Sequence, residues 1–361
     1  MKPNAIDASN GAKKILISLP NWLGDIVMSL PTVKGMRWLF PESHISVLVT
    51  SSFAPLFKYN NDINDVISYE RGKGLRRFVK GLKIAKTMRE KRFDLAVILP
   101  RSFNSALIPF LSRIPQRIGY SADARSILLT HPVTRSGDLL SQHRVYYFLN
   151  LLSSFRRDDK SISVSDGIPE GTTAPRIQLG KDEEKWVDKV LTTAYGRELI
   201  GFNAGATYGS AKCWLPERYA ELAHKLIAKF NATILLFGSK GETRTNSEIS
   251  GKLPKERVLV LTAKTDIIQL ATLFKRCRFL VTNDTGPMHV ATAVDTPVVA
   301  IFGPTDAVTT APFGTNHIII RKEVNCSPCL KRTCPIDHRC MKLISVEDVF
   351  NACEKMVKTT N

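Results

Sequence analysis

The fold of this chain is decided by one stretch, Asn283-Asp-Thr-Gly-Pro-Met-His-Val-Ala-Thr-Ala-Val-Asp-Thr-Pro-Val-Val-Ala-Ile-Phe-Gly-Pro-Thr-Asp306. It follows a short apolar run at 279–281, which is typical of a buried strand, and it contains a second such run at 298–302. Between the two runs, the polar residues can cap a helix that has Pro287 in its first turn. In parallel sheets built from such units, ligands bind beyond the carboxyl ends of the strands. The alternative interpretation is an ordinary helix cap followed by an ordinary turn.

Apolar runs and helical segments alternate over the rest of the chain as well. In the first half, short apolar runs predict strands at 14–19, 45–49, 66–67, 95–99 and 116–120. In the second half, they predict strands at 199–203, 233–237, 258–261 and 317–320. Segments with apolar residues at helical spacing lie between them, and this alternation implies parallel sheets with right-handed crossovers.

A polar tract at 154–173 interrupts the alternation, because it lacks apolar periodicity and contains several Gly and Pro residues. We interpret it as a linker between two Rossmann-like parallel-sheet domains of the α/β class, residues 1–172 and 173–344, which face each other across a cleft. The tail at 345–361 has apolar residues at helical spacing and a capping pattern at Ser345 and Asp348, which predict a final helix.

The composition is that of a soluble globular protein with an unusual charge balance. Of the 361 residues, 43% are hydrophobic, and 51 Lys and Arg against 33 acidic residues give a net charge of +18. Such a charge favours acidic partners, namely nucleic acid, phosphorylated ligands or anionic lipid. The sequence contains neither a signal peptide nor an apolar run of about 18 residues, so we expect a cytoplasmic protein with only peripheral membrane contact.

The most basic segment, residues 71–92, contains ten Lys or Arg residues and one acidic residue, Glu90. Its apolar residues fall at helical spacing and predict a face that docks on the sheet: Leu75, Phe78, Val79, Leu82 and Ala85. The basic face is either an ordinary solvated face or a patch for a membrane surface or an anionic ligand. A nucleic-acid binder would need aromatic residues among the basic ones for stacking, and this segment has only Phe78.

Four of the seven cysteines cluster in one segment with the spacing Cys326-x2-Cys329-x4-Cys334-x5-Cys340. In a reducing compartment such clustering indicates thiols or metal ligands more than disulfides. The spacing does not match the paired Cys-x2-Cys motifs of a zinc ribbon. We therefore expect reduced thiols in a tight loop, with a structural metal as the alternative.

The loop from Gly205 to Lys212 joins a predicted strand to a predicted helix and consists largely of small residues. Small residues let backbone N–H groups approach an anion, and Lys212 adds a full positive charge, so the loop can hold a diphosphate. It matches neither a Walker sequence nor Gly-x-Gly-x-x-Gly, so ATPase activity and NAD binding are not indicated. Glu242 lies four residues after Gly238, at the carboxyl end of the predicted strand 233–237, where a carboxylate can bind ribose hydroxyls. A plain flexible loop and an ordinary surface glutamate are the alternatives.

Asp25 is the best candidate for a general base. It follows Gly24 in the loop after the first predicted strand, where an N-terminal helix cap is the alternative role. His289 can contact a phosphate or a sugar hydroxyl, or it is a structural residue of a helical turn. We find no Ser/His/Asp hydrolase motif, no paired-acid glycosidase pattern and no Asp-x-Asp metal–nucleotide motif.

Three segments together resemble the ADP-heptose:lipopolysaccharide heptosyltransferases: Asn21-Trp-Leu-Gly-Asp-Ile-Val-Met-Ser-Leu-Pro31, Gly205-Ala-Thr-Tyr-Gly-Ser-Ala-Lys212 with Trp214, and Asn283-Asp-Thr-Gly-Pro-Met-His-Val-Ala291. The segment Cys329-Leu-Lys-Arg-Thr-Cys-Pro335 with Cys340-Met341 is similar to the heptosyltransferase II branch of that family. The resemblance extends from about residue 14 to 350. Arg101 stands where a smaller polar residue is expected, and Leu215 stands in place of a usual proline.

The resemblance implies a GT-B glycosyltransferase with an acceptor-binding first domain, a donor-binding second domain and a last helix, 345–361, that packs back on the first. It implies catalytic roles for Asp25 as base and for Lys212. It assigns the donor to Thr207, Lys212, Glu242, Asp284, Thr285, Gly286 and His289, and we add Arg101, Asn104 and Arg117 as candidates for acceptor binding. No metal and no cofactor are implied.

The function that we predict is the inverting transfer of L-glycero-D-manno-heptose from ADP-heptose onto the first heptose of the lipopolysaccharide inner core. The acceptor would be of the heptosyl-Kdo-lipid A type, at the anionic inner membrane leaflet, with no nucleic acid partner. The alternatives are another sugar-nucleotide enzyme of this fold, such as a different glycosyltransferase or an epimerase, and a basic non-enzymatic binder of nucleic acid or anionic membrane.

Overall fold

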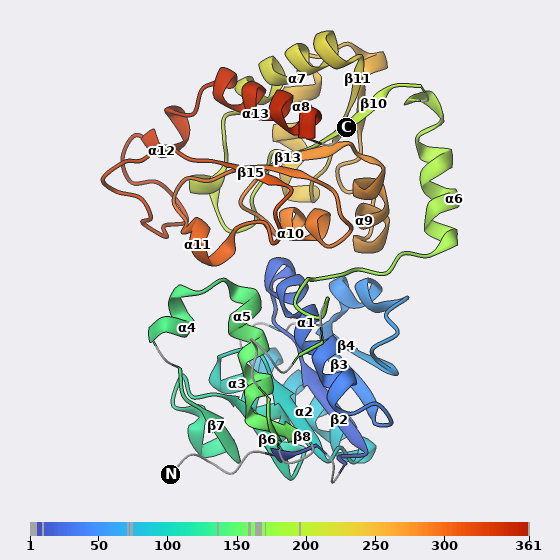
Figure 1. Cartoon of the computed structure of the whole chain (residues 1–361), viewed down its shortest axis with the longest axis vertical. Helices are drawn as coiled ribbons and strands as arrows, with labels where there is room; N and C mark the ends of the chain where they lie inside the picture. Colours follow the sequence, from blue (N-terminus) through green and yellow to red (C-terminus); the bar gives the residue numbers. More distant parts are fainter. Residues whose placement is uncertain are drawn as a thin grey trace. The chain divides into compact units, whose positions relative to one another are not determined.

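The computed structural model describes residues 6–8, 11–70, 72, 75–135, 137–157, 160–162, 168–169, 171–194 and 196–359. The chain divides into two compact units, Met1–Arg176 and Ile177–Asn361. The division lies close to the domain boundary that we expected after residue 172. Each unit is built around its own parallel sheet with helices packed against it (Figure 1).

The first unit contains a six-stranded sheet in the order β4-β3-β2-β5-β6-β7. Its strands are β2 (Lys14–Ser18), β3 (His44–Thr50), β4 (Asp65–Tyr69), β5 (Leu95–Ile98), β6 (Gln116–Tyr120) and β7 (His131–Val133). All neighbouring strands are parallel, with Ile17 of β2 opposite Val47 on one side and Val97 on the other. The central strands are apolar because helices cover both faces of a parallel sheet.

The helices of the first unit are α1 (Leu23–Leu39), α2 (Leu75–Lys91), α3 (Phe103–Leu111), α4 (Gly137–Ser141) and α5 (Arg144–Leu149). Single 3-10 turns are η1 (Ser51–Phe57), η2 (Arg125–Leu128) and η3 (Asn150–Ser154). A small second sheet has the order β1-β8-β9, formed by β1 (Ile6–Asp7), β8 (Phe155–Arg157) and β9 (Lys160–Ser161).

Part of the tract that we interpreted as a linker, 154–173, forms the strands β8 and β9. The reason is Phe155, which is buried and packs edge-on against Phe40 with 5.6 Å between ring centroids. This contact ties β8 to the end of α1, and β8 then pairs in parallel with β1. Residues 158–159, 163–167 and 170 of the tract lie outside the described residues.

The second unit repeats the plan with a six-stranded parallel sheet in the order β12-β11-β10-β13-β14-β15. Its strands are β10 (Glu198–Asn203), β11 (Ala232–Leu236), β12 (Val258–Val260), β13 (Phe279–Asn283), β14 (Val298–Ile301) and β15 (His317–Ile320). Its helices are α6 (Lys181–Val190), α7 (Pro216–Phe230), α8 (Thr243–Ser250), α9 (Ile267–Arg276), α10 (Gly286–Thr292), α11 (Ala307–Thr310), α12 (Arg339–Lys342) and α13 (Val346–Thr359). Two Rossmann-like parallel-sheet units confirm the predicted fold class.

The last helix, α13, packs within the second unit, beside α7 and β15 (Figure 1). Ser345 and Asp348 cap it as predicted, with the Asp348 carboxylate 2.8 Å from the Ser345 nitrogen. Its residues Val349, Cys353 and Met356 are buried in the same core as the sheet. The apolar face of α13 is thus occupied inside the second unit, whereas we expected this helix to pack on the first domain.

The docking face of α2 differs from the predicted one. Ala85 and Met88 are buried, and Met88 is 0% exposed, but Val79 and Leu82 are 59% and 44% exposed. Val79 lies about 120° around the helix from Ala85, since each residue turns the chain by about 100°. The side chains of Leu75 and Phe78 lie outside the described residues. Part of the predicted apolar face therefore points to solvent.

This assignment of faces predicts different costs for two substitutions on one helix. Met88→Ala should lower the free energy of unfolding by about 2–5 kcal/mol, because it leaves a cavity in the core. Val79→Ser should change it by less than about 0.5 kcal/mol, as surface substitutions usually do. Urea denaturation of both variants beside the parent measures the difference. Equal losses for the two variants would contradict the assignment.

Candidate functional site

The site of the second unit lies where β10 and β13 end side by side. These strands pair in parallel with Asn203 opposite Thr282, so the loop after β10 and the turn after β13 emerge at the same edge. Asn283, the last residue of β13, is fully buried. Its amide nitrogen donates to the Ala204 carbonyl at 2.7 Å, and its oxygen accepts from the Trp214 nitrogen at 3.1 Å.

The central polar contact of this site is a buried ion pair between Lys212 and Asp284. The Lys212 ammonium lies 2.6 Å from the Asp284 carboxylate, and the two side chains are only 13% and 5% exposed. Thr305 donates a second hydrogen bond to the same carboxylate at 2.6 Å. The Asp284 side chain therefore pairs with Lys212 instead of capping a helix. Because an ammonium has three donors, Lys212 can still donate to an anion.

The loop that carries Lys212 is held tightly from both sides. A Cβ atom at Gly205 would lie 2.2 Å from Cγ of Glu242, and one at Gly209 would lie 2.2 Å from the Arg332 carbonyl oxygen. Only glycine permits these close approaches. Thr207, in the middle of the loop, is exposed. The loop can thus present backbone N–H groups and Thr207 to a ligand without a large change of shape.

Glu242 is the last residue of the 3-10 turn η6 (Lys240–Glu242), which follows β11, and it has a structural partner. Its carboxylate accepts from the Ser239 backbone nitrogen, and together the two residues form a capping box. The carboxylate is half-buried and keeps further acceptor capacity, since each oxygen has two lone pairs. Glu242 therefore acts as a capping residue in this structure, and its role at the ribose stays a prediction.

Helix α10 begins at this edge as the sequence predicts. Thr285 is its N-cap, Pro287 stands in its first turn, and Gly286 is its first residue. Asn203 donates to the Thr285 hydroxyl at 3.2 Å, which connects β10 to the start of α10. His289 lies one turn further on and is 4% exposed. The structure thus gathers Lys212, Asp284, Thr285, Gly286 and His289 on adjacent elements.

The cysteine-rich segment packs against the Lys212 loop. Tyr208 donates to the Leu330 carbonyl at 2.8 Å, and the Ala211 nitrogen donates to the Arg332 carbonyl at 3.0 Å. One pocket of about 200 Å³ is lined by Cys326, Cys329, Cys334, Cys340 and His338, among others. Burial and the three neighbouring thiols raise the pKa of the Cys340 thiol, which keeps it protonated.

Within the part of the chain that the structure describes, no group of three or more His, Cys, Asp or Glu side chains is arranged to hold a metal ion. All seven cysteines are free thiols.

The site of the first unit lies at the carboxyl ends of β2, β5, β6 and β7. A pocket of about 540 Å³ there is lined by Pro20, Asn21, Trp22, Asp25, Leu99, Pro100, Arg101, Ser102, Ala122, Asp123, Arg135, Arg144, Tyr147 and Phe148. Trp22 is the N-cap of α1, and Asp25 stands in its first turn. Asp25 is therefore not the N-cap residue itself, and its role as a general base stays a prediction.

The three residues that we proposed for acceptor binding lie in different places. Arg101 lines the same pocket as Asp25. Asn104 lines a neighbouring pocket of about 290 Å³. Arg117 lies in the strand β6, where its guanidinium donates to the Leu128 carbonyl at 2.7 Å and lies over the Phe110 ring at 5.4 Å. The side chain of Arg117 thus holds the turn after β6.

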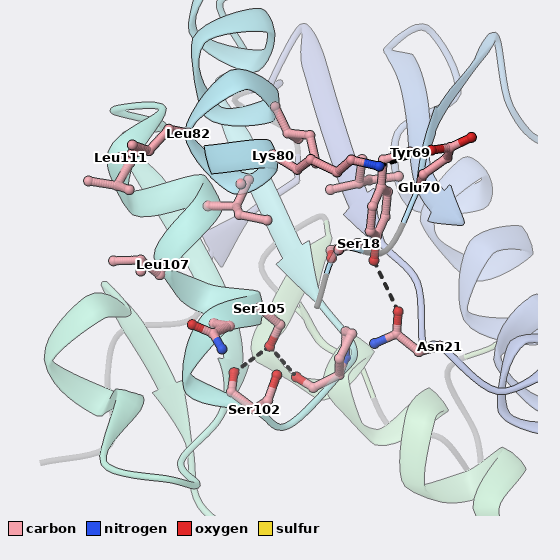
Figure 2. Close-up of a pocket in the computed structure, with 17 residues that line it drawn as sticks. Ser18, Asn21, Tyr69, Glu70, Lys80, Leu82, Ser102, Ser105, Leu107 and Leu111 are labelled. Carbon is pink, nitrogen blue, oxygen red and sulfur yellow. Dashed lines mark hydrogen bonds and ion pairs between the residues drawn. The ribbon is translucent and has the colours of Figure 1, made fainter. Parts of the chain in front are cut away.

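The neighbouring pocket is mixed in character (Figure 2). On one side lie the apolar side chains Leu82, Leu107 and Leu111, from α2 and α3. Opposite them, Tyr69 donates to the Asn21 side-chain oxygen at 3.0 Å. Asn21, Pro100 and Ser102 line both pockets, so the two adjoin along one sheet edge.

Comparison with known proteins adds to this geometry. Residues 81–339 match the model of glycosyltransferase family 9 (heptosyltransferase). The chain is 32% identical over 311 residues to lipopolysaccharide heptosyltransferase 2 of Salmonella typhimurium, covering 85% of this chain and 88% of that one. It is 35% identical over 320 residues to lipooligosaccharide heptosyltransferase 2 of Haemophilus ducreyi, with the same coverage.

A solved structure, that of Escherichia coli ADP-heptose lipopolysaccharide heptosyltransferase II, superimposes with a TM-score of 0.81 at 29% identity, covering 96% of this chain and 99% of that one. Two Rossmann-like units with strand-end sites are the architecture of the GT-B class, and the family match makes this chain a glycosyltransferase of that class. The chain belongs to glycosyltransferase family 9, the heptosyltransferases. This membership rules out the alternative of a non-enzymatic basic binder.

The cysteine geometry leads to a prediction about metal content. Protein purified under reducing conditions should carry well under one zinc per chain by elemental analysis, because the thiols are not arranged as a ligand set. A Cys334→Ser variant, as the control, should have the same metal content as the parent. Stoichiometric zinc that survives dialysis and is lost in the variant would contradict this prediction.

Proposed function

We propose that this enzyme transfers L-glycero-D-manno-heptose from ADP-heptose onto the first heptose of the lipopolysaccharide inner core, with inversion at the anomeric carbon. The observation that carries the proposal is the identity of 32–35% over 85% of the chain to proteins named heptosyltransferase 2. The geometry of the two sites supports it, since one offers an anion-binding edge and the other a carboxylate in a pocket.

The donor would bind at the edge of the second unit. The Lys212 ammonium, the backbone N–H groups of 206–208 and the Thr207 hydroxyl would hold the diphosphate, because they supply positive charge and donors. Glu242 would accept hydrogen bonds from the ribose hydroxyls. Asp284, Thr285, Gly286 and His289 would contact the heptose and the adjoining phosphate.

The reaction requires one proton transfer and one displacement. The Asp25 carboxylate takes the proton of the acceptor hydroxyl, whose oxygen attacks the anomeric carbon opposite the leaving group. The bond from that carbon to the diphosphate breaks through an oxocarbenium-like transition state, and ADP departs with the electron pair. Lys212 stabilises the charge that develops on the diphosphate, a contribution of about 3–4 kcal/mol for a well-placed donor. Every step uses groups of this chain and its two substrates.

The acceptor, of the heptosyl-Kdo-lipid A type, would bind in the first unit. Arg101 lines the pocket with Asp25, and Asn104 lines the adjoining pocket, so both can contact an extended saccharide. Arg117 is engaged with backbone carbonyls and would act by holding the turn that follows β6.

We also propose that the enzyme works at the cytoplasmic face of the inner membrane as a peripheral protein. Helix α2 supports this, because exposed Val79 and Leu82 lie near Lys80, Lys83 and Lys86 along the helix. Such a mixture of apolar and basic side chains favours an anionic lipid surface. Among the described residues, no helix is long and apolar enough to cross a bilayer.

The first prediction from this mechanism concerns Lys212. Lys212→Ala should weaken ADP binding about tenfold or more, since a charge-assisted hydrogen bond contributes about 1.5–3 kcal/mol. It also leaves the Asp284 carboxylate buried without its partner, which destabilises the fold. Adding Asp284→Asn should therefore restore the melting temperature of Lys212→Ala but not its affinity for ADP.

Calorimetric titration with ADP and thermal unfolding measure the two effects separately. Lys275→Ala, which removes an exposed lysine on α9, is the matched control. Parental ADP affinity in the Lys212→Ala protein would remove this residue from the donor site.

The second prediction concerns Asp25. Asp25→Asn should keep the fold, because the loss of charge in the first turn of α1 costs about 0.3–1 kcal/mol. It should slow heptose transfer about 10²- to 10⁴-fold, the range typical of general-base catalysis, with unchanged ADP-heptose affinity. The measurement is transfer under saturating substrates, followed by mass spectrometry of the acceptor.

Asp138→Asn provides the control, since Asp138 also stands in the first turn of a helix, α4, and is exposed. Near-normal turnover of the Asp25→Asn protein would exclude Asp25 as the base.

A further inference from the structure

We propose that the cysteine-rich segment, residues 326–340, is a positioning element of the donor site, in which Tyr208 and His338 hold Lys212 beside Asp284 for the diphosphate. The inference rests on the proposed function, since it concerns the donor of the same reaction. It gives a role to a motif that the proposed mechanism does not use. It also adds two positioning residues, Tyr208 and His338, to which the sequence assigned no role.

The segment holds the residue immediately before Lys212 by both of its backbone polar groups. The Ala211 nitrogen donates to the Arg332 carbonyl at 3.0 Å, and the Ala211 carbonyl accepts from Nε2 of His338 at 2.8 Å. A carbonyl can only accept, so Nε2 of His338 carries the proton of this hydrogen bond. Ala211 is itself buried. The backbone from which the Lys212 side chain extends is therefore fixed by the segment.

Tyr208 connects the segment to the Lys212 ammonium. Its hydroxyl donates to the Leu330 carbonyl at 2.8 Å, and the ammonium lies 4.9 Å from the centroid of its ring. A cation over the face of an aromatic ring at this distance is attracted to it. The ring thus limits where the ammonium can lie, and the hydrogen bond of the hydroxyl fixes the ring.

The same segment also holds the loop that binds Asp284. The Leu330 nitrogen donates to the Pro304 carbonyl at 2.8 Å. The next residue, Thr305, donates to the Asp284 carboxylate at 2.6 Å. Leu330 therefore joins the two loops of the donor site, one through its N–H group and the other through its carbonyl.

The backbone of Leu330 is strained, and these two hydrogen bonds account for the strain. Its φ angle is 56°, in the left-handed region, which is unusual for a bulky residue. Such conformations persist where the surrounding structure over-determines them. The side chain does not explain the conformation, because it is 59% exposed. The contacts that hold Leu330 are those of its backbone with the two donor-site loops.

The far end of the segment is anchored in the core of the second unit, at α12 (Figure 1). Cys340 and Met341 are buried in the same cluster as the central strands. The Ser327 hydroxyl donates to the Gly303 carbonyl at 2.6 Å, and a Cβ atom at Gly303 would lie 2.4 Å from the Met341 sulfur. Only glycine permits this approach, so the loop after β14 packs directly on α12. A segment anchored in this way can fix Lys212 instead of moving with it.

The number of donors on Lys212 shows why its position matters. The ammonium donates to the Asp284 carboxylate at 2.6 Å and to the Asp284 carbonyl at 3.2 Å. An ammonium has three donors, so one remains for a ligand, and its direction depends on where the side chain begins. If the loop were released, this donor would turn away from the diphosphate. Misplacement of a catalytic group by 1 Å can slow a reaction about 10²-fold.

The test compares His338→Ala and Tyr208→Phe with His224→Ala as the matched control. His224 also binds a backbone carbonyl, that of Lys252 at 2.7 Å, but it lies on α7 and contacts neither donor-site loop through this bond. The Kd of ADP should rise about three- to tenfold in the first two variants, as expected for a lost neutral hydrogen bond. Their kcat should fall about ten- to hundredfold.

Adenosine provides the second ligand, because it lacks the diphosphate. Its Kd and the melting temperature of both variants should stay within the range of the control. Competition of ADP and of adenosine against a fluorescent ADP derivative measures the two affinities. His338→Gln, whose side-chain amide can donate to the Ala211 carbonyl, should recover most of the ADP affinity.

A double-mutant comparison shows whether His338 acts through Lys212. In the background Lys212→Ala with Asp284→Asn, adding His338→Ala should cost no further ADP affinity, because the cation that it positions is gone. Additive losses would refute the positioning role. It would also be refuted if His338→Ala and Tyr208→Phe bound ADP like the control, or if their affinities for ADP and adenosine fell by the same factor.

ADP binding and heptose transfer separate this inference from the proposed function. If the parent enzyme transfers no heptose but binds ADP in a manner that depends on Tyr208 and His338, the proposed function is wrong and the positioning role stands. If it transfers heptose while both variants keep the ADP affinity of the control, the positioning role is wrong and the proposed function stands.

Discussion

The geometry of the second unit depends on the buried side chain of Asn283. Its amide donates to the Ala204 carbonyl at 2.7 Å, and its oxygen accepts from the Trp214 nitrogen at 3.1 Å and the Tyr219 hydroxyl at 3.2 Å. One residue at the end of β13 thus joins the loop after β10 to the start of α7. Without these bonds, several buried polar groups would lose their partners, each at a cost of about 1–3 kcal/mol. Because Ala204 and Trp214 flank the loop that carries Lys212, these hydrogen bonds help to hold Lys212 beside Asp284.

The Lys212–Asp284 pair is better understood as preorganisation than as stabilisation. Removing two charges from water costs several kcal/mol, which their attraction offsets only with good geometry and further hydrogen bonds. The third partner, Thr305, supplies such a bond. A cation fixed before the substrate arrives needs no reorganisation when charge develops on a leaving group, and this is the condition under which electrostatic catalysis is strongest. The close contacts of Gly205 and Gly209 keep the loop in that state.

Local sequence patterns were sufficient to predict the central strands of both sheets and the start of one helix near the site. Apolar runs located the central strands of both sheets, and the segment after β13 located Asp284 and α10. The sequence was insufficient where contacts between residues far apart in the chain determine which segment forms a strand or which face of a helix is buried. The strand β7, His131–Val133, was missed because its three residues form no apolar run, and with it Arg135 was missed. The exposure of Val79 on α2 was missed because apolar spacing predicts a helical face but does not show which part of that face packs on a neighbour. Phe155 forms a strand only through Phe40, which is distant in the sequence.

The two sites differ in how their charges are balanced, and this difference bears on their roles. In the second unit, the cation Lys212 already has an anionic partner, so a diphosphate adds to an existing network. In the first unit, Arg101, Arg135 and Arg144 have no such partner among the described residues, and Arg125 and Tyr147 leave buried donors unmatched. Uncompensated charge lowers the stability of the folded chain, and an anionic ligand that binds only the folded state restores it. An anionic ligand bound in this pocket would therefore stabilise the first unit.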